Sequence, residues 1–344
     1  MSPAVIQVGV GLWGRSWAEL VARARGFRLA AVVDAGPEAR RWAAESLGVP
    51  TFTTLQRALD AVPAEVVLLI SPPETHRPLA ETAFAAGRHV VVEKPLASTM
   101  DDAVAIVEAA RAAKKVAMVG QNYRFRRQSR TLGRLLAEGA LGDLRALRID
   151  FRRDLRSRRI SPRDWRGRMA HPLLLDMSIH HVDLLRSITG TDLVEVDARS
   201  WRVGDSPFAH DPSVAALLTL ADGTPVSYTG TWSEALGRET SWNGDWELVG
   251  SAARATWTGG VNDALRGTVR LERYGSRSER PAPPPLPVLD RLAVLHEARR
   301  AIRDGVEPEC SAADNLRTLA AVLALARSTE LRAPVAVQQV GSIP

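Results

Sequence analysis

Short apolar runs alternate with longer amphipathic segments over the first 121 residues, and few folds accommodate this pattern. The runs are rich in Val and Ile, which is typical of strands buried on both faces of a sheet. Segments with helical spacing separate them, as right-handed crossovers between parallel strands require. The alternation predicts an α/β domain built on a doubly wound parallel sheet. The expected strands are 4–10, 28–34, 65–70, 89–93 and 115–120, and the expected helices are 13–25, 38–47, 55–61, 76–86 and 100–113.

The pattern changes after residue 121. A helix at 126–138 precedes a long strand at 144–156 and a helix at 172–189. Further strand-like runs with turn signals between them indicate one antiparallel sheet. These runs are 193–201, 214–220, 226–232, 242–249, 253–257 and 268–274, and helices at 288–304 and 311–328 close the chain. We therefore expect two domains, 1–121 and 122–344, the second an α+β domain with a large open, mainly antiparallel sheet.

Composition limits the class of protein. Of 344 residues, 45% are hydrophobic and 24% are charged, which is ordinary for a soluble globular protein. No run approaches the roughly 18 apolar residues of a membrane span, and Met1 to Pro3 lead into the first apolar run, unlike a signal peptide. Cys310 is the single cysteine, so we expect a cytoplasmic protein. The net charge of +6 is small and dispersed, so neither nucleic acid nor a membrane is an expected partner.

A glycine motif follows the first strand. Gly9, Gly11 and Gly14 form G-x-G-x-x-G, and Leu12 and Trp13 open the first helix within it. The first glycine allows a tight turn, the second lets the backbone approach a pyrophosphate, and the third lets helix and strand pack closely. The helix N-terminus offers its N–H groups to that pyrophosphate.

Asp34 ends the second strand, twenty residues after Gly14, where a carboxylate can accept hydrogen bonds from ribose hydroxyls. The order of these features predicts a Rossmann dinucleotide-binding domain over 1–121. A carboxylate here repels the 2′-phosphate of NADP, so NAD is the expected cofactor. NADP remains open, because Arg40 and Arg41 lie within reach of the adenine side.

Further cofactor contacts are expected at the carboxyl ends of the other strands, where a doubly wound sheet has its ligand crevice. Ser71 and Pro72 form a rigid loop after the strand at 65–70, and His76 stands in the first turn of the next helix. His76 has two interpretations, a cofactor contact or local packing. Glu93, Lys94 and Gln121 stand at the carboxyl ends of two further strands, and we include them in the cofactor site.

Lys94 is one of only three lysines among 45 basic residues, and it follows an apolar strand. An ammonium group there is partly desolvated, which favours proton exchange with a substrate hydroxyl. Arginine cannot replace it, because a guanidinium keeps its proton near neutral pH. Lys94 is therefore a candidate catalytic residue, against the alternative of a surface lysine beside Glu93.

The helix at 172–189 carries a second candidate group. Asp176 and His180 are four residues apart and share one face. A carboxylate one turn from an imidazole can orient it for acid–base catalysis. His181 points away and is expected to pack inside or at an interface. Metal binding by these three residues is the rival interpretation, but the i, i+4 histidine pair of a zinc helix is missing, so no metal is expected.

In their order these motifs resemble those of the Gfo/Idh/MocA oxidoreductases, relatives of glucose–fructose oxidoreductase and inositol dehydrogenase. The resemblance covers nearly the whole chain. It rests on the glycine motif, Asp34, Glu93-Lys94-Pro95, GQNYRF (120–125), DMSIHHVD (176–183) and SAADNLRTLAAVLALARS (311–328). It implies a Rossmann domain, a second domain with a large open sheet that binds substrate and joins subunits, and NAD(P)-linked hydride transfer on a sugar, cyclitol or related polyol.

The resemblance also implies roles for single residues. Lys94, Asp176 and His180 match the catalytic trio of the family. His180 would take the proton of a secondary alcohol, Lys94 would polarise the same oxygen, and Asp176 would hold a neighbouring hydroxyl or the imidazole. Tyr123 and Arg124 would border the nicotinamide and the substrate.

His171 and Pro172 stand where the family usually has glycines, so His171 could bring a second imidazole into the pocket. Ten arginines lie from Arg145 to Arg168, a span that also holds Trp165. They indicate either an anionic substrate or, more simply, a solvated or subunit-facing strand. His171 and Trp165 are carried as candidate substrate contacts.

Trp242 and Trp246 fit sugar stacking or a sheet surface buried between subunits. We expect a homodimer or homotetramer formed through the second sheet. Three functions fit the whole: an NAD(P)-dependent dehydrogenase or reductase, which we favour, a glycoside-cleaving enzyme of the same fold that retains its NAD, and a non-catalytic dinucleotide or sugar sensor. The proton-exchanging set Lys94, Asp176 and His180 disfavours the sensor.

Overall fold

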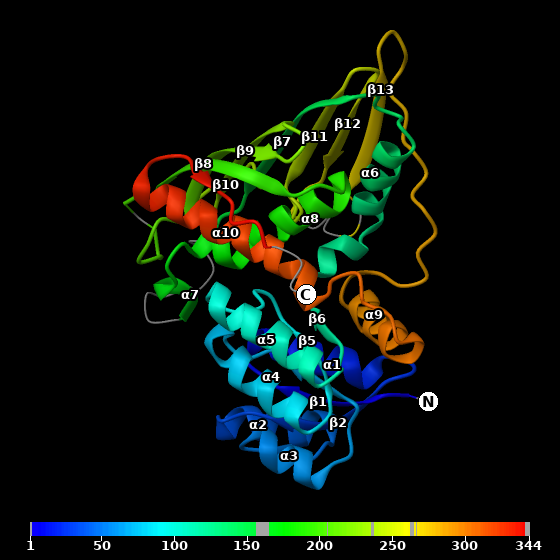
Figure 1. Ribbon diagram of the computed structural model, residues 1–344, viewed down its shortest axis with the longest axis vertical. Helices are drawn as coiled ribbons and strands as arrows, with labels where there is room; N and C mark the ends of the chain where they lie inside the picture. The colour runs from blue at the N-terminus through cyan, green and yellow to red at the C-terminus, as the bar shows by residue number, and fades with distance from the viewer. Residues whose placement is uncertain are drawn as a thin grey trace. The chain divides into compact units, whose positions relative to one another are not determined.

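The computed structural model describes residues 2–155, 165–204, 206–234, 237–261, 265 and 267–340. They form two compact units (Figure 1). Unit 1 comprises Met1–Asn122 and Asp290–Leu316, and unit 2 comprises Tyr123–Leu289 and Arg317–Pro344. The chain thus returns to unit 1 after the strands of unit 2. The division into functional domains at 121 and 122 stays a prediction.

Unit 1 contains a parallel sheet with the strand order β3-β2-β1-β4-β5-β6, as the alternation predicts. The strands are β1 (Ala4–Val8), β2 (Arg28–Val33), β3 (Thr51–Phe52), β4 (Val66–Leu69), β5 (His89–Val92) and β6 (Ala117–Val119). Every residue of β1 and β4 is buried, because helices cover both faces of the sheet. The strand order reverses at β1 and β4, and a doubly wound sheet has its ligand crevice at the carboxyl ends of such strands.

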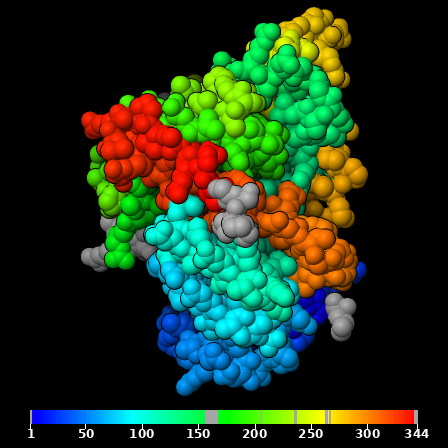
Figure 2. All heavy atoms as spheres, viewed as in Figure 1, coloured from blue at the N-terminus to red at the C-terminus, as the bar shows by residue number. Residues whose placement is uncertain are grey.

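Unit 1 also contains the following helices, of which all but the last lie in the connections between these strands. They are α1 (Leu12–Arg23), α2 (Pro37–Leu47), α3 (Leu55–Ala61), η1 (Pro73–Thr75), α4 (His76–Ala85), α5 (Met100–Ala112) and α9 (Asp290–Asp304). Helices α4 and α5 lie in front of the sheet in Figure 1, and their side chains cover this face in Figure 2.

Unit 2 contains a larger sheet with the strand order β13-β12-β11-β7-β10-β9-β8-β14. The strands are β7 (Leu144–Arg152), β8 (Leu193–Trp201), β9 (Ser213–Leu220), β10 (Pro225–Thr231), β11 (Asp245–Gly250), β12 (Ala253–Thr258), β13 (Thr268–Arg273) and β14 (Val335–Ala336). Strands β7 and β10 pair in parallel, so the sheet is mainly antiparallel rather than wholly so. The reason is topological, since the intervening helix α8 makes the crossover that a parallel pair needs.

The helices of unit 2 are η2 (Asn122–Phe125, which begins in unit 1), α6 (Arg127–Ala137), α7 (Trp165–Arg168), η3 (Leu174–Ser178), α8 (Ile179–Thr189) and α10 (Ala312–Leu331, which begins in unit 1). In Figure 1, α6, α8 and α10 lie on the same side of the sheet. The predicted helix at 172–189 is interrupted, because η3 is a π-helix. Such widened turns occur frequently at functional sites.

No helix among the described residues is both long enough and apolar enough to cross a membrane.

Candidate active site

The glycine turn after β1 is shaped by close packing. Gly9 has a φ of 92°, and a Cβ there would lie 2.7 Å from the carbonyl oxygen of Ile70. A Cβ on Gly14 would collide with the carbonyl of Gly9. A Cβ on Gly11, by contrast, would meet nothing within 4 Å. The turn is therefore tight where strand and helix meet and open at the middle glycine, which fits the backbone approach of a pyrophosphate.

The first turn of α1 lies beside this opening. Buried Gln7 fixes the glycine turn, because its side-chain amide donates hydrogen bonds to the carbonyls of Gly9 (2.9 Å) and Gly14 (2.7 Å). Leu12 is 91% exposed and Trp13 is 43% exposed, so both stand at the surface expected to face the cofactor. A helix N-terminus in this position favours an anionic group.

Asp34 links the end of β2 to the glycine turn. Its carboxylate accepts hydrogen bonds from the backbone N–H groups of Val10 and Gly36, each at 2.8 Å. Each carboxylate oxygen can accept a further bond, so a ribose could still bind. Arg40 donates through Nη1 to the backbone carbonyls of Asp34 and Ala35, each at 2.7 Å.

His76 joins two loops of unit 1. One ring nitrogen lies 2.9 Å from the carbonyl oxygen of Ser71, and the other lies 3.1 Å from those of Pro95 and Leu96. The ring is fully buried, and burial lowers the pKa of His76 while the carbonyl acceptors oppose that shift. These contacts are the local packing that one interpretation expects. A contact between His76 and the cofactor stays a prediction.

The Ser71–Pro72 loop beside it is fixed by Thr75, whose hydroxyl contacts the Ser71 hydroxyl and the Pro72 carbonyl, each at 2.7 Å. Ser71 is half-buried and Pro72 is exposed. Gln121 is fully buried just after β6. The structure therefore brings these predicted residues to the carboxyl ends of β4 and β6.

Glu93 stands at the end of β5 and ties this strand to α1. The indole N–H of Trp17 donates to its carboxylate (3.1 Å), and the Trp13 side chain also hydrogen-bonds it. Burial raises the pKa of Glu93 to about 7, and the charge of Lys94 opposes the shift. Arg291, at the start of α9, lies 4.7 Å from the ring centre of Trp13 and 5.4 Å from that of Trp17. Lys94 is half-buried and follows this anchored carboxylate directly.

In unit 2, His180 stands in the first turn of α8, just after the π-helix. Its ring stacks on that of Tyr123, with 4.2 Å between ring centres and 7° between planes. Asp176 lies within η3 and is half-buried, whereas His180 is 6% exposed. The structure thus brings two sequence-predicted residues, His180 and Tyr123, into contact.

A buried ion pair one turn further along α8 was not predicted. The guanidinium of Arg124 donates to both carboxylate oxygens of Asp183, at 2.7 and 2.6 Å, and the Thr318 hydroxyl donates to the same group. Both charged side chains are almost inaccessible. The only sequence signal was the position of Asp183, three residues after His180. A substrate contact for Arg124 stays a prediction.

His181 packs inside unit 2, as its direction on the helix predicts. Its Nε2 donates to the Trp242 carbonyl (3.3 Å), so its Nδ1, 3.1 Å from the Tyr228 hydroxyl, is the acceptor in a neutral ring. Burial lowers the pKa of His181 to about 4. Among the described residues, no group of three His, Cys, Asp or Glu side chains is placed to hold a metal ion.

His171 has a φ of 50°, in the region that favours glycine, which explains why glycine suits this position. Its Nε2 lies 3.2 Å from the Glu330 carboxylate on α10. Trp165 opens α7, but its side chain lies outside the described residues, as do residues 156–164 of the arginine-rich span. Substrate contacts for His171 and Trp165 stay predictions.

Three of the described arginines of this span have protein partners. Arg148 is exposed and pairs with Glu247, and Arg152 pairs with Asp245. Arg153 is buried and donates to backbone carbonyls of residues 240 and 261. The simpler interpretation, a solvated strand, accounts for Arg148.

The two tryptophans of the 240–246 segment do not share one role. Trp246 is 1% exposed and stacks on Trp257 in the core, so the expectation of a surface for sugars or subunits is wrong for it. Trp242 lies before β11 rather than within the predicted strand, because a turn from Ser241 to Gly244 precedes β11.

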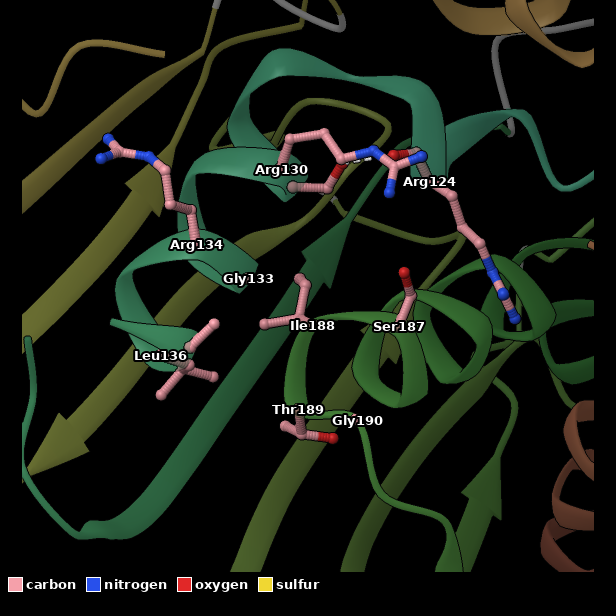
Figure 3. Close-up of a pocket in the computed structure, with 11 residues that line it drawn as sticks. Arg124, Arg130, Gly133, Arg134, Leu136, Ser187, Ile188, Thr189 and Gly190 are labelled. Carbon is pink, nitrogen blue, oxygen red and sulfur yellow. Dashed lines mark hydrogen bonds between the residues drawn. The ribbon is translucent and has the colours of Figure 1, made fainter. Parts of the chain in front are cut away.

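A cavity of about 460 Å³ opens between α6 and α8 (Figure 3). Figure 3 shows Ser187 to Gly190 along its α8 side and Arg134 pointing away from Arg124. Its arginines have partners: Arg124 binds Asp183, Arg130 lies over Phe125, and Arg134 donates to Glu138 and to the Ala282 carbonyl. Their charge also suits the C-terminal end of α8.

Two family models match the chain. One, described as "Oxidoreductase family, NAD-binding Rossmann fold", matches residues 4–121, and the other, "GFO/IDH/MocA C-terminal domain", matches residues 129–256. The D-apiose dehydrogenase of Paraburkholderia graminis is 28% identical over 328 residues, which cover 92% of this chain and 84% of that protein.

Solved structures share the fold. The aldose-aldose oxidoreductase from Caulobacter crescentus, complexed with glycerol, superposes with a TM-score of 0.85 at 24% identity, covering 98% of this chain and 100% of that one. A levoglucosan dehydrogenase in complex with NADH and levoglucosan superposes with a TM-score of 0.82 at 21% identity, with the same coverage.

Proposed function

The chain belongs to the GFO/IDH/MocA family of NAD(P)-dependent oxidoreductases, and from this premise we propose that it transfers hydride between NAD and a secondary alcohol or ketone of a sugar, cyclitol or related polyol. The observation that carries the proposal is the end of β5. There Lys94 follows Glu93, which is hydrogen-bonded to Trp17 of the helix that begins at the glycine turn. The residue before Lys94 is thereby tied to α1 within unit 1, which supports a role for the Lys94 amine beside the cofactor.

The proposed chemistry divides between cofactor and protein. When bound, NAD supplies the hydride acceptor. The open face at Gly11 and the first turn of α1 would bind its pyrophosphate, and Asp34 would bind its adenosine ribose. We propose NAD over NADP because the carboxylate of Asp34 would repel a 2′-phosphate.

Proton transfer and the positioning of the substrate oxygen are assigned to three residues. His180 accepts the proton of the alcohol, Lys94 polarises the oxygen, and Asp176 holds a neighbouring hydroxyl or orients the imidazole. Acid–base groups of this kind typically contribute 10²- to 10⁴-fold. The names of the relatives support a polyol substrate, since a D-apiose dehydrogenase and a levoglucosan dehydrogenase are among them.

The test is a substrate screen followed by substitution. Cyclitols, aldoses, uronic acids and their keto forms are screened for NADH formation or consumption with NAD and NADP compared. On the best substrate, Lys94→Met should lower kcat/KM by at least about 10²-fold. Lys114→Met, at an exposed lysine at the end of α5, is the matched control. Undiminished activity of Lys94→Met, or turnover without net NADH, would contradict the proposal.

A further inference from the structure

A line of buried side chains in unit 2 leads from the turn at 240–244 to His180. Arg126 donates to the side-chain oxygen of Asn243. The Arg126 guanidinium lies 3.3 Å from the ring centre of Tyr123, and that ring also stacks on His180. The exposed fractions of these residues are 5% or less for Asn243 and Arg126, and below 9% for Tyr123 and His180.

We propose that Tyr123, Arg126 and Asn243 are positioning residues that aim the His180 imidazole for proton transfer. This inference rests on the proposed function, in which His180 exchanges the proton of the substrate. A proton acceptor must lie within hydrogen-bond reach of the hydroxyl, and a misplacement of about 1 Å can cost about 10²-fold in rate. A ring held parallel to a fixed aromatic face cannot rotate out of that plane.

The backbone alone does not fix this ring. His180 begins its helix directly after the π-helix η3, where the helical hydrogen-bond register changes. The aromatic ring of Tyr123, which belongs to a different element, η2, therefore packs flat against the imidazole. Arg126 fixes the Tyr123 ring through a cation–π contact. Such a contact is stronger when it is desolvated, and Arg126 is buried.

The far end of the line is anchored in a turn. Asn243 donates to the Ser241 hydroxyl through both its backbone N–H and its side-chain amide, each at 3.2 Å. Its carbonyl accepts from the indole of the core residue Trp246 (2.7 Å). This anchoring gives the TSWNGDW segment a role as the outer support of His180.

The test compares two substitutions of one ring. Tyr123→Leu should lower kcat by about 10- to 100-fold. Tyr123→Phe retains the flat face and should restore most of that rate. Arg126→Met and Asn243→Ala retain the Tyr123 ring and should lower kcat less than Tyr123→Leu does. Of the two, Arg126→Met should have the larger effect. They also carry the test if Tyr123→Leu fails to fold.

A second readout does not depend on activity. The NMR signal of the His180 ring, identified by its disappearance in His180→Asn, should show a ring-current shift that Tyr123→Phe retains and Tyr123→Leu loses. Normal kcat in Tyr123→Leu alongside an inactive His180→Asn would overturn the positioning role and leave the proposed function intact. A fully active His180→Asn would instead overturn the proposed function, and the positioning role with it.

Discussion

The two regions that carry the predicted site hold their side chains in different ways. In unit 1, backbone groups hold the side chains. The Asp34 carboxylate accepts hydrogen bonds from two backbone N–H groups, and the His76 ring lies within hydrogen-bond distance of three backbone carbonyls. In unit 2, side chains distant in sequence hold α8, with Arg124 on Asp183 and Tyr123 on His180. The first arrangement depends on chain conformation, and the second depends on the identity of a few buried residues.

The largest effect on stability is expected where unit 2 depends on one buried charge pair. Arg124→Met leaves the Asp183 carboxylate buried without its cation and should lower the free energy of unfolding by about 3–5 kcal/mol. The double variant Arg124→Met/Asp183→Leu should recover much of this loss, because no charge then remains unpaired. Urea unfolding measures all three proteins. Equal stability of the parent and Arg124→Met would contradict the side-chain account of unit 2.

In unit 1 a comparable effect should come from pH. The pKa of Glu93 is raised to about 7 from its ordinary 4.5, so the folded state binds the proton more tightly than the unfolded state. Its stabilising contribution is present below about pH 4.5 and is lost as pH rises through about 7, a change of about 3 kcal/mol.

Glu93→Gln removes this titration. The free energy of unfolding of Glu93→Gln should therefore improve relative to the parent between pH 4.5 and 7, as measured by urea unfolding at both ends of the range. A difference that stays constant with pH would show that Glu93 does not titrate in this window.

Substitutions at two glycines test whether the stability of unit 1 depends on chain conformation. Gly9→Ala forces a φ of 92° on alanine against the Ile70 carbonyl and should cost about 1–3 kcal/mol of stability. Gly11→Ala meets no protein atom within 4 Å and should leave stability unchanged, yet weaken NADH binding about tenfold. Thermal unfolding and NADH titration separate the two. Unchanged NADH affinity in Gly11→Ala would place the pyrophosphate elsewhere.

The smallest effect is expected at an exposed ion pair of unit 2. Arg148 is 62% exposed where it meets Glu247, so Arg148→Ala should change the free energy of unfolding by about 0–1 kcal/mol. Compared with Arg124→Met, it shows that burial, and not the number of ion pairs, determines their contribution. A loss as large as that of Arg124→Met would mean that this surface is covered in solution.

The sequence predicts unit 1 well because its signals are local. Strand period, the glycine motif and Asp34 each depend on residues within one βαβ segment, and the predicted strands are confirmed. The two-residue strand β3 gives too short a pattern to detect. The return of Asp290–Leu316 to unit 1 depends on contacts such as that of Arg291 with Trp13, which no periodicity reveals.

Unit 2 is predicted in outline only, because its decisive contacts span long sequence distances. The parallel pairing of β7 with β10 and the Arg124–Asp183 pair each join residues far apart in the chain. The π-helix η3 has no signature in a pattern of apolar residues. Trp242 was placed in a strand because the predicted strand absorbed a turn that a buried Asn243 stabilises.

The central proposal is that Lys94 and His180 serve a single proton transfer. A double-substitution cycle tests it most directly, with kcat/KM measured for Lys94→Met, His180→Asn and the combined variant. Residues that act as a unit are strongly non-additive, so each single variant should lose at least about 10²-fold and the combined variant little more. Losses that multiply to about 10⁴-fold would contradict the claim, because each residue would then contribute independently of the other.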